Sequence, residues 1–234
     1  MTTSAPSSSA SCSPLRLPAG LRFGYREAPW KGGRTQEVLR LDEELRLEPG
    51  LHLLIAANGA GKTTLMRTLA GLQPILQGSL GNAPEAVFFA DDLAFADELS
   101  ARMIFQSLLP KAWQSEALAL SAQWRLDTDK IYSQLSRGNR QKIPLILAET
   151  RQRLSQGCLL LQDESLAGLD AWTRREVCRV WGSAEARHIR LIALHETDAL
   201  QGADSVLSLR EGRLVQHHPA DAAALKQLCE TLIE

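Results

Sequence analysis

Asn58-Gly59-Ala60-Gly61-Lys62-Thr63-Thr64 is the stretch that decides how this sequence is interpreted. It directly follows the apolar run at residues 51–55, and apolar residues at helical spacing continue beyond it as far as Gly71. Small residues allow consecutive backbone N–H groups to turn toward a phosphate group, and a lysine at this spacing reaches the outer oxygens. The order of strand, loop and helix therefore predicts a phosphate-binding loop.

We expect residues 58–64 to bind a nucleoside triphosphate together with Mg²⁺. Lys62 is expected to reach the β- and γ-phosphate oxygens, and the Thr63 hydroxyl is the expected magnesium ligand. Ala56 stands where such loops usually carry their first glycine. Ala56 can replace this glycine only if its φ and ψ angles lie in a region that every residue can adopt, because a left-handed conformation costs ~1 kcal/mol or more. The alternative, a glycine-rich turn before an exposed lysine, is disfavoured by the spacing.

Two acidic residues end another apolar run, Leu-Leu-Leu-Gln-Asp-Glu at residues 159–164. At the end of a buried strand, Asp163 can hold the magnesium shell and Glu164 can orient or deprotonate an attacking water. A solvated acidic turn is the alternative, but a turn alone would not explain why the pair follows a buried strand. We predict that Asp163 acts on the metal side and that Glu164 is the base.

His195 follows a similar apolar run at residues 191–194. An imidazole at this position could contact the γ-phosphate and help to position the water, although a lone histidine after a strand more often has a structural role. The functional role of His195 is favoured only because the other motifs occur in the same sequence. The predicted catalytic residues are therefore Lys62, Glu164 and His195.

The remaining patterns place these motifs in a larger architecture. The runs at residues 158–161 and 191–194 are typical of parallel strands buried on both faces, with chemistry at their carboxyl ends. The glycine and proline residues within residues 27–36 are typical of a loop, here between two antiparallel edge strands. Apolar residues at mixed three- and four-residue spacings in residues 97–132 indicate a separate helical segment. Residues 1–14 are rich in Ser, Ala and Pro, and we expect a disordered tail there.

Composition limits the compartment and the partners. The formal net charge of -1 gives no general attraction to nucleic acid, so nucleic acid is not an expected partner. The four cysteines are widely spaced and form no Cys-x-x-Cys pair, which favours a reduced, cytoplasmic compartment. No apolar run approaches the ~18 residues that span a bilayer, and no signal peptide is apparent. Any membrane role would therefore depend on a partner.

One further segment, Leu-Ser-Arg-Gly-Asn-Arg-Gln-Lys at residues 135–142, lies between the loop and the acids. With residues 58–64, residues 159–164, Ala-Gly-Leu-Asp at 167–170 and His195, it resembles the ATP-binding cassette (ABC) family, whose motifs follow the same order. The resemblance covers nearly the whole chain after the tail. It implies an α/β fold at residues 15–234: a P-loop NTPase core with a mainly parallel sheet, an antiparallel β edge subdomain and a helical subdomain at about residues 93–150.

The resemblance also implies a head-to-tail dimer in which each ATP lies between the loop of one cassette and the signature segment (residues 135–142) of the other. Ser136 can cap a helix there, and Gly138 permits close approach, so that helical N–H groups point at the partner's γ-phosphate. An ordinary helix cap at Ser136 is compatible with this role. Asp170 resembles the family's aspartate that contacts the opposite cassette.

Two assignments within the family pattern have alternatives. Tyr25 is the leading candidate for stacking on adenine, and Trp30 is the other, since stacking needs only a π-face near the base. In the segment at residues 87–92, Asp91 or, one place along, Asp92 stands where the family presents a glutamine to magnesium and to the transporter partner. An aspartate can still accept a hydrogen bond from a metal-bound water, although its charge alters the site.

Other departures concern the signature segment. Arg137 and Asn139 replace its first glycine and its glutamine, and Ser165 replaces the proline that commonly follows the paired acids. Pro144 falls inside the helix expected to follow the signature, where a missing N–H and a ring clash cost ~3 kcal/mol. We predict a bend or an early break of the helix there.

The leading functional hypothesis is the ATPase subunit of a membrane transporter whose permease is a separate chain. The protein would act as a homodimer or heterodimer at the cytoplasmic face of the membrane, and its signature resembles those of export-type systems. The cargo is not encoded, because the membrane subunits select it. Two alternatives stay open: a soluble ABC protein acting on ribosomes or DNA, and a regulatory subunit that binds ATP with little hydrolysis.

Overall fold

A mixed eight-stranded sheet organises the computed structural model, which describes residues 12–26, 33–90, 92–154, 158–183, 187–194 and 202–233. Its strand order is β2-β3-β10-β9-β5-β8-β7-β6, and β1 and β4 form a separate antiparallel pair. The strands are β1 (Leu15–Leu17), β2 (Arg22–Arg26), β3 (Thr35–Arg40), β4 (Leu45–Leu47), β5 (Gly50–Ala56), β6 (Ala86–Phe89), β7 (Leu159–Asp163), β8 (Ile189–Ala193), β9 (Ser205–Arg210) and β10 (Arg213–His217).

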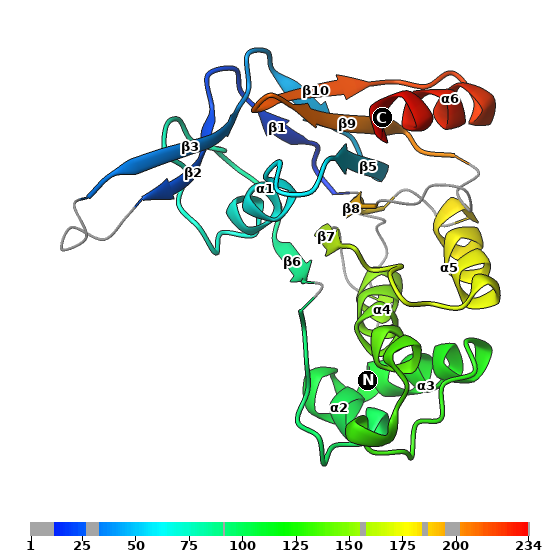
Figure 1. Ribbon diagram of the computed structural model, residues 1–234. Helices are drawn as coiled ribbons and strands as arrows, with labels where there is room; N and C mark the ends of the chain where they lie inside the picture. Colours follow the sequence, from blue (N-terminus) through cyan, green and yellow to red (C-terminus); the bar gives the residue numbers. More distant parts are fainter. Residues whose placement is uncertain are drawn as a thin grey trace, which may run out of the picture.

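The helices cover both faces of this sheet and form a separate arm. They are α1 (Lys62–Leu69), α2 (Ala101–Leu108), α3 (Gln114–Gln123), α4 (Arg137–Leu154), α5 (Ala171–Ser183) and α6 (Ala222–Ile233), with two short 3-10 helices at Lys111–Trp113 and Tyr132–Gln134. Figure 1 shows α2, α3 and the beginning of α4 gathered below the sheet. None of the helices in the described residues is long and apolar enough to cross a membrane.

The central strands are buried on both faces, as their apolar runs predict. Alternate side chains point to opposite sides of a strand, so Leu160 and Ile192 belong to one hydrophobic core and Leu161 and Leu191 to another. Helices α2 to α6 contribute to the first core, and α1 packs in the second. The pairs β9–β5, β5–β8, β8–β7 and β7–β6 are parallel, which confirms the mainly parallel sheet.

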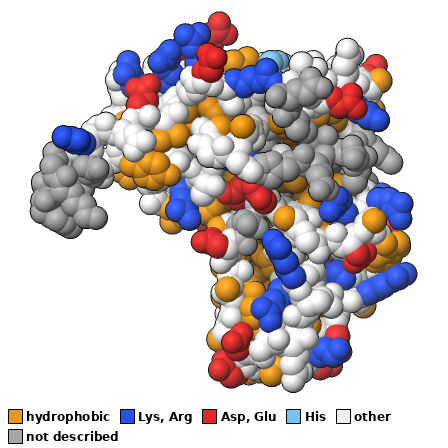
Figure 2. All heavy atoms as spheres, in the orientation of Figure 1, with side chains coloured by type: hydrophobic (Ala, Val, Ile, Leu, Met, Phe, Trp, Pro, Cys, Tyr) orange, Lys and Arg blue, Asp and Glu red, His pale blue; other side chains and the backbone are white. Residues whose placement is uncertain are grey.

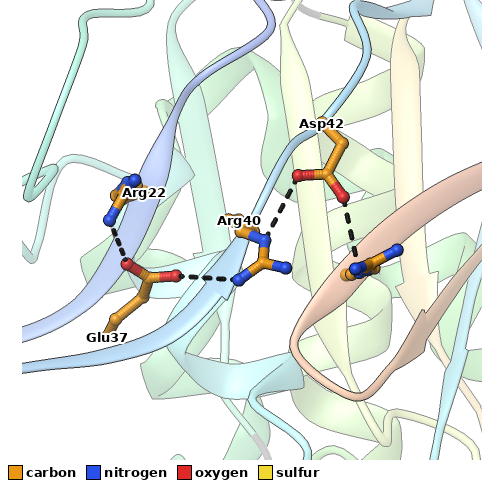
Figure 3. A network of polar contacts seen from close by, with 5 residues as sticks. Arg22, Glu37, Arg40 and Asp42 are labelled. Carbon is orange, nitrogen blue, oxygen red and sulfur yellow. Dashed lines mark hydrogen bonds and ion pairs between the residues drawn. The ribbon is translucent and has the colours of Figure 1, made fainter.

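The antiparallel edge forms where the sequence predicts it. Strands β2 and β3 pair antiparallel, and an ion-pair chain links them as Arg22–Glu37–Arg40–Asp42 (Figure 3). Among these three ion pairs the Arg22–Glu37 contact is the shortest at 2.9 Å, but its side chains are 50% and 32% exposed. Exposed pairs of this kind contribute only about 0–1 kcal/mol each. The edge is therefore held mainly by its backbone pairing and by buried Phe23.

Pro144 does not end the helix that contains it. Helix α4 runs from Arg137 to Leu154, with Pro144 inside it and buried. The predicted early break is therefore wrong. Residues on both sides of Pro144, including Ile143, Leu145 and Ile146, are completely buried in the core. Packing of this length of helix offsets the ~3 kcal/mol that a proline costs in a helix interior.

Candidate nucleotide site

The phosphate-binding loop connects β5 to α1 at the carboxyl edge of the sheet. Gly59 and Gly61 have φ angles of 77° and 113°, which favour glycine. At Gly61 an added Cβ would lie 2.6 Å from a methyl carbon of Val38. Ala56 ends β5 and is not among the described non-glycine residues with positive φ, which are Arg125, Glu164 and Glu211. Alanine therefore fits the first position without strain.

Helix α1 begins at Lys62 with its amino end open toward the loop. Its N-cap is Gly61, which has no side chain to accept a hydrogen bond from the first turn. The first N–H groups of a helix have no intrahelical acceptor, and the helix dipole adds partial positive charge at this end. The loop thus has the geometry that binds a phosphate anion.

Lys62 lies inside the curve of this loop. Its ammonium donates to the carbonyl oxygens of Ala56 at 3.0 Å and Ala57 at 3.4 Å, and the residue is 6% exposed. Burial lowers the pKa of Lys62, and the negative charges of Glu164 and Asp163 partly restore it. The lysine is therefore held among loop carbonyls within electrostatic reach of both predicted acids.

Thr63 and Asp163 join the loop to the neighbouring strand. The Thr63 hydroxyl donates to Asp163 Oδ2 at 2.6 Å, and Asp163 is buried at the end of β7. A hydroxyl and a carboxylate are hard oxygen ligands, and Mg²⁺ is commonly held by one or two such groups together with phosphates and waters. The two residues present therefore fit the magnesium ion that the resemblance implies.

Glu164 follows Asp163 in a turn that brings it beside β8. Its φ is 47°, its N–H donates to the carbonyl oxygen of Ala193 at 3.1 Å, and its own carbonyl oxygen accepts from Ala167. Non-glycine residues in left-handed conformations are uncommon and concentrate at functional sites. The turn places a carboxylate next to the metal-side aspartate, as the predicted base requires.

Tyr25 also contacts the loop helix. Its hydroxyl lies 2.6 Å from Thr64 Oγ1, while Thr64 is buried and Tyr25 is 46% exposed. The backbone of β2 is held in place by Gln73, whose side chain donates to the carbonyl oxygen of Gly24. Tyr25 thus combines a hydroxyl fixed on the loop helix with an exposed aromatic ring, and this ring is available to a nucleotide base.

The signature segment starts α4 as predicted. The Ser136 hydroxyl accepts a hydrogen bond from the N–H of Asn139 at 3.3 Å, so Ser136 is an N-cap. Gly138 permits a close approach, but in this structure the approach is to the same chain: an added Cβ would lie 2.8 Å from the carbonyl oxygen of Gly168. The start of α4 therefore packs directly on the loop that follows the acids.

Further contacts fix that loop, residues 165–170. Gln141 Nε2 donates to the Ser165 carbonyl oxygen at 3.3 Å, and buried Lys142 Nζ lies 3.9 Å from Asp170 Oδ2. Asp170 also accepts from the N–H of Thr173 at 2.8 Å, which lowers the pKa of its carboxyl together with the Thr173 hydroxyl bond. Sequence reasoning missed Gln141 and Lys142, because both contacts depend on how α4 lies against this loop.

Three predicted residues, His195, Asp91 and the adenine alternative Trp30, lie outside the described residues. Strand β8 ends at Ala193, directly before the segment that contains His195. Asp92 is exposed in the turn after β6, and β6 pairs with β7 through Phe89 and Gln162. The described part of the site therefore comprises the loop, Tyr25, the paired acids, the signature segment and the 165–170 loop.

Comparisons with known proteins identify the family and the fold. No family model matches the chain. The chain is 32% identical over 211 residues to an aliphatic sulfonates import ATP-binding protein of Agrobacterium fabrum, covering 84% of this chain and 80% of that protein. The solved structure of an ATP-binding subunit of an ABC transporter superposes with a TM-score of 0.70 at 20% identity, covering 94% of this chain and all of that one.

A second solved structure has the same fold. The dimeric, post-hydrolysis state of an ATP-binding cassette bound to ADP and Pi superposes with a TM-score of 0.67 at 14% identity, covering 87% of this chain and 98% of that one. At such low identity the structures support the fold, whereas the curated relative supports the family. The chain is therefore a member of the ATP-binding subunits of ABC transporters, the ATPases of those systems.

Proposed function

We propose that this chain hydrolyses ATP at a site built by Lys62, Thr63, Asp163 and Glu164, and that the reaction powers a separate membrane permease. The observation that carries the proposal is the 2.6 Å bond between Thr63 and Asp163, which joins the phosphate-binding loop to the strand of the acids. The electrostatic influence of both acids on Lys62 supports the same arrangement. One nucleotide can therefore contact all four residues.

Each residue has a separate task in the proposed reaction. Lys62 and the first-turn N–H groups of α1 bind the β- and γ-phosphates, and Tyr25 supports the adenine. Glu164 accepts the proton of the water whose oxygen attacks the γ-phosphorus, while the bond to the β–γ bridging oxygen breaks to give ADP and phosphate. We assign the positioning of that water to His195 as well, whereas Asp91 or, one place along, Asp92 would accept a hydrogen bond from a water bound to the magnesium ion.

Thr63 and Asp163 are the residues that would hold Mg²⁺. When bound, the ion supplies positive charge that stabilises the phosphate oxygens as negative charge shifts onto the leaving group. The hydroxyl of Thr63 and the carboxylate of Asp163 already lie together, so little rearrangement of these side chains is needed. This preorganisation favours electrostatic stabilisation of the transition state.

The proposed active form is a dimer. Ser136 and Gly138 of one subunit would face the γ-phosphate held by Lys62 of the other, and Asp170 would contact the opposite cassette. Ser136 is exposed at the amino end of α4, where the helix dipole favours an anion. The second subunit is either a copy of this chain or a different cassette.

The proposed permease contact lies on the helical subdomain. Met103 and Leu108 on α2 are 47% and 46% exposed, although both are large apolar residues. A separate permease fits the curated relative, which is named as an import ATP-binding protein. We therefore propose import, rather than the export that the signature segment indicates. The chain would be held at the cytoplasmic face of the membrane by that permease.

Nucleic acid is a poor alternative partner. Figure 2 shows Lys and Arg side chains interspersed with Asp and Glu on the visible face, without a continuous basic surface. Proteins that bind nucleic acid through phosphates usually present clustered Lys and Arg. This mixed surface supports a transporter subunit over a protein that acts on ribosomes or DNA.

Purified protein tests the proposal through Mg²⁺-dependent release of phosphate from ATP. We expect activity in the unmodified protein and a loss to background in Lys62→Ala, with Lys226→Ala on α6 as a matched lysine control. Affinity purification from the natural source should recover a membrane protein in amounts comparable to this chain. Background hydrolysis in the unmodified protein would favour the regulatory alternative, and absence of any membrane partner would contradict the permease assignment.

A further inference from the structure

Arg125 occupies a fixed turn at the end of α3 in the helical subdomain. Its φ of 56° is left-handed, and its N–H donates to the Ala122 carbonyl oxygen at 3.2 Å. The residues on either side, Trp124 and Leu126, are 0% and 5% exposed. Two buried neighbours thus anchor the turn in the core of the subdomain and fix the point from which the Arg125 side chain leaves it.

The Arg125 side chain reaches out of the helical subdomain to α5. Its guanidinium carbon lies 4.0 Å from the centroid of the Trp172 ring, well within the ~6 Å of a cation–π contact. Figure 1 shows α3 below α5 in this region. Among the described residues Arg125 forms no ion pair, so the indole ring is its principal partner.

Trp172 directly follows the 165–170 loop. It is the second residue of α5, and Asp170 caps this helix through its bond to Thr173. The other side of the loop is held by α4 through Gln141 and Lys142. Contacts from α3 and α4 therefore hold this loop to the helical subdomain, together with the signature segment at the start of α4.

We propose that Arg125 is a positioning residue that acts, through Trp172, on the nucleotide bound by the second subunit. Stacking of Arg125 on Trp172 fixes the 165–170 loop against α4, so that Asp170 and Ser136 meet the opposite cassette together. The proposal rests on the dimer of the proposed function. Arg125 would therefore differ from Lys62 and Thr63 of the phosphate-binding loop, which would bind the nucleotide of their own chain.

The role of Arg125 can be distinguished from that of Lys62 and Thr63 by measuring dimerisation and ATP affinity separately. Removing Arg125 should weaken dimerisation and leave the ATP affinity of the single subunit unchanged, because in the proposed dimer Asp170 and Ser136 contact the opposite subunit and its nucleotide, and not the nucleotide bound by their own chain. A residue needed merely for folding would lower thermal stability and nucleotide affinity together. A cation–π contact of the expected strength changes an equilibrium by about threefold to thirtyfold.

The experiment uses the full chain with Glu164→Gln, which is expected to retain ATP in a stable dimer. ATP affinity is measured by titration at a concentration where the protein is monomeric, and the dimer dissociation constant is measured by sedimentation with ATP. The variants are Arg125→Ala, Trp172→Ala and their combination, with Arg125→Lys and Trp172→Phe as conservative changes. Arg179→Ala, an exposed α5 arginine paired with Glu176, is the control.

Each Ala variant should weaken the dimer by about threefold to thirtyfold, and the combination by no more than the larger single effect. Arg125→Lys and Trp172→Phe should restore most of the affinity, and Arg179→Ala should have no effect. If Arg125→Ala leaves the dimer dissociation constant unchanged, or weakens ATP binding by the monomer as much as it weakens the dimer, the positioning role of Arg125 is overturned. The proposed function would not be affected by either result. If Glu164→Gln itself neither binds ATP nor dimerises, the proposed function fails and this inference with it.

Discussion

The hydroxyl of Thr63 lies 2.6 Å from Asp163 Oδ2, although 100 positions separate the two residues in the chain. Thr63 lies in the first turn of the helix after β5, and Asp163 ends β7, with β8 between these two strands in the sheet. The carboxyl ends of parallel strands lie at the same edge of a sheet, and open α/β sheets bind ligands at that edge. The sheet topology is thus sufficient to bring together the two residues that we propose hold the metal ion.

Replacing Asp163 by Asn should weaken Mg²⁺ binding while the fold remains intact. The amide keeps a hydrogen-bond acceptor for Thr63 but removes the negative charge that attracts the ion. We expect about a 10-fold to 100-fold higher Mg²⁺ requirement for hydrolysis. Titration of ATPase activity with Mg²⁺ checks this, with Glu230→Gln on α6 as the control. An unchanged Mg²⁺ requirement would exclude Asp163 from the metal site.

Motif order predicted this part of the structure well. The apolar runs that precede residues 58–64 and Asp163 form parallel strands of one sheet, each paired with β8 between them, as expected of strands buried on both faces. Ser136 is the helix cap that its position indicates. These features depend on local sequence and on one topological rule, and both are visible without a structure.

Contacts between charged residues in the interior could not be predicted in the same way. Arg190 interrupts an apolar strand, and Glu149 lies on α4, so the sequence shows two isolated charges without indicating that they meet. Such pairs depend on how helices and strands pack after the local elements form.

Tyr25 and Trp30 can be distinguished by substitution. If the Tyr25 ring supports adenine, Tyr25→Ala should weaken ATP binding by about 0.5–1.5 kcal/mol, roughly twofold to tenfold, whereas Tyr25→Phe retains the ring. The Phe variant also removes the hydroxyl contact with Thr64, so any remaining loss measures that bond. Calorimetric titration with ATP is the measurement. A loss in Trp30→Ala with none in Tyr25→Ala would assign adenine to Trp30.

The buried pair of Glu149 and Arg190, between α4 and β8, should make the protein sensitive to the loss of either partner alone. Their side chains are 1% and 3% exposed and meet at 2.5 Å, and Trp181 Nε1 donates to the same carboxylate oxygen at 2.8 Å. Glu149→Leu or Arg190→Met alone should cost about 3–5 kcal/mol, because each leaves a buried charge unpaired. The measurement is urea unfolding.

The double variant provides the matched control for this pair. Glu149→Leu combined with Arg190→Met removes both charges, and replacement of a buried pair by apolar residues is often neutral or stabilising. We therefore expect the double variant to recover most of the free energy of unfolding that either single change loses. Additive losses would show that the two side chains contribute independently, against the pairing seen in the structure.

His52 should make the protein less stable in mild acid. It is 2% exposed, its Nε2 lies 2.7 Å from the Glu48 carbonyl oxygen and its Nδ1 lies 2.8 Å from Ser205 Oγ. Burial lowers the pKa of His52, a shift that His218 increases and that the contacts with Glu48 and Asp204 partly oppose. The folded protein therefore holds this histidine neutral at pH values where the unfolded chain is protonated.

Because the unfolded state binds more protons, stability is retained above about pH 6.5 and falls as the pH drops from there toward the lowered pKa of the folded state. The free energy of unfolding, measured in urea across this range, should decrease less steeply in His52→Gln than in the unmodified protein. His188 and His217 also have lowered pKa values, so part of the slope should remain. Identical slopes in both proteins would contradict the role of His52.

If this chain is an ATPase whose site is completed across a dimer, Glu164→Gln should separate hydrolysis from dimerisation. The amide keeps the shape of the Glu164 side chain but cannot accept the proton of water, so hydrolysis should fall by about 10²-fold to 10⁴-fold. Light scattering should then show a dimer with ATP and Mg²⁺ and a monomer with ADP. A monomer under both conditions would show that ATP does not join two subunits, and hydrolysis at the unmodified rate would show that Glu164 is not the base.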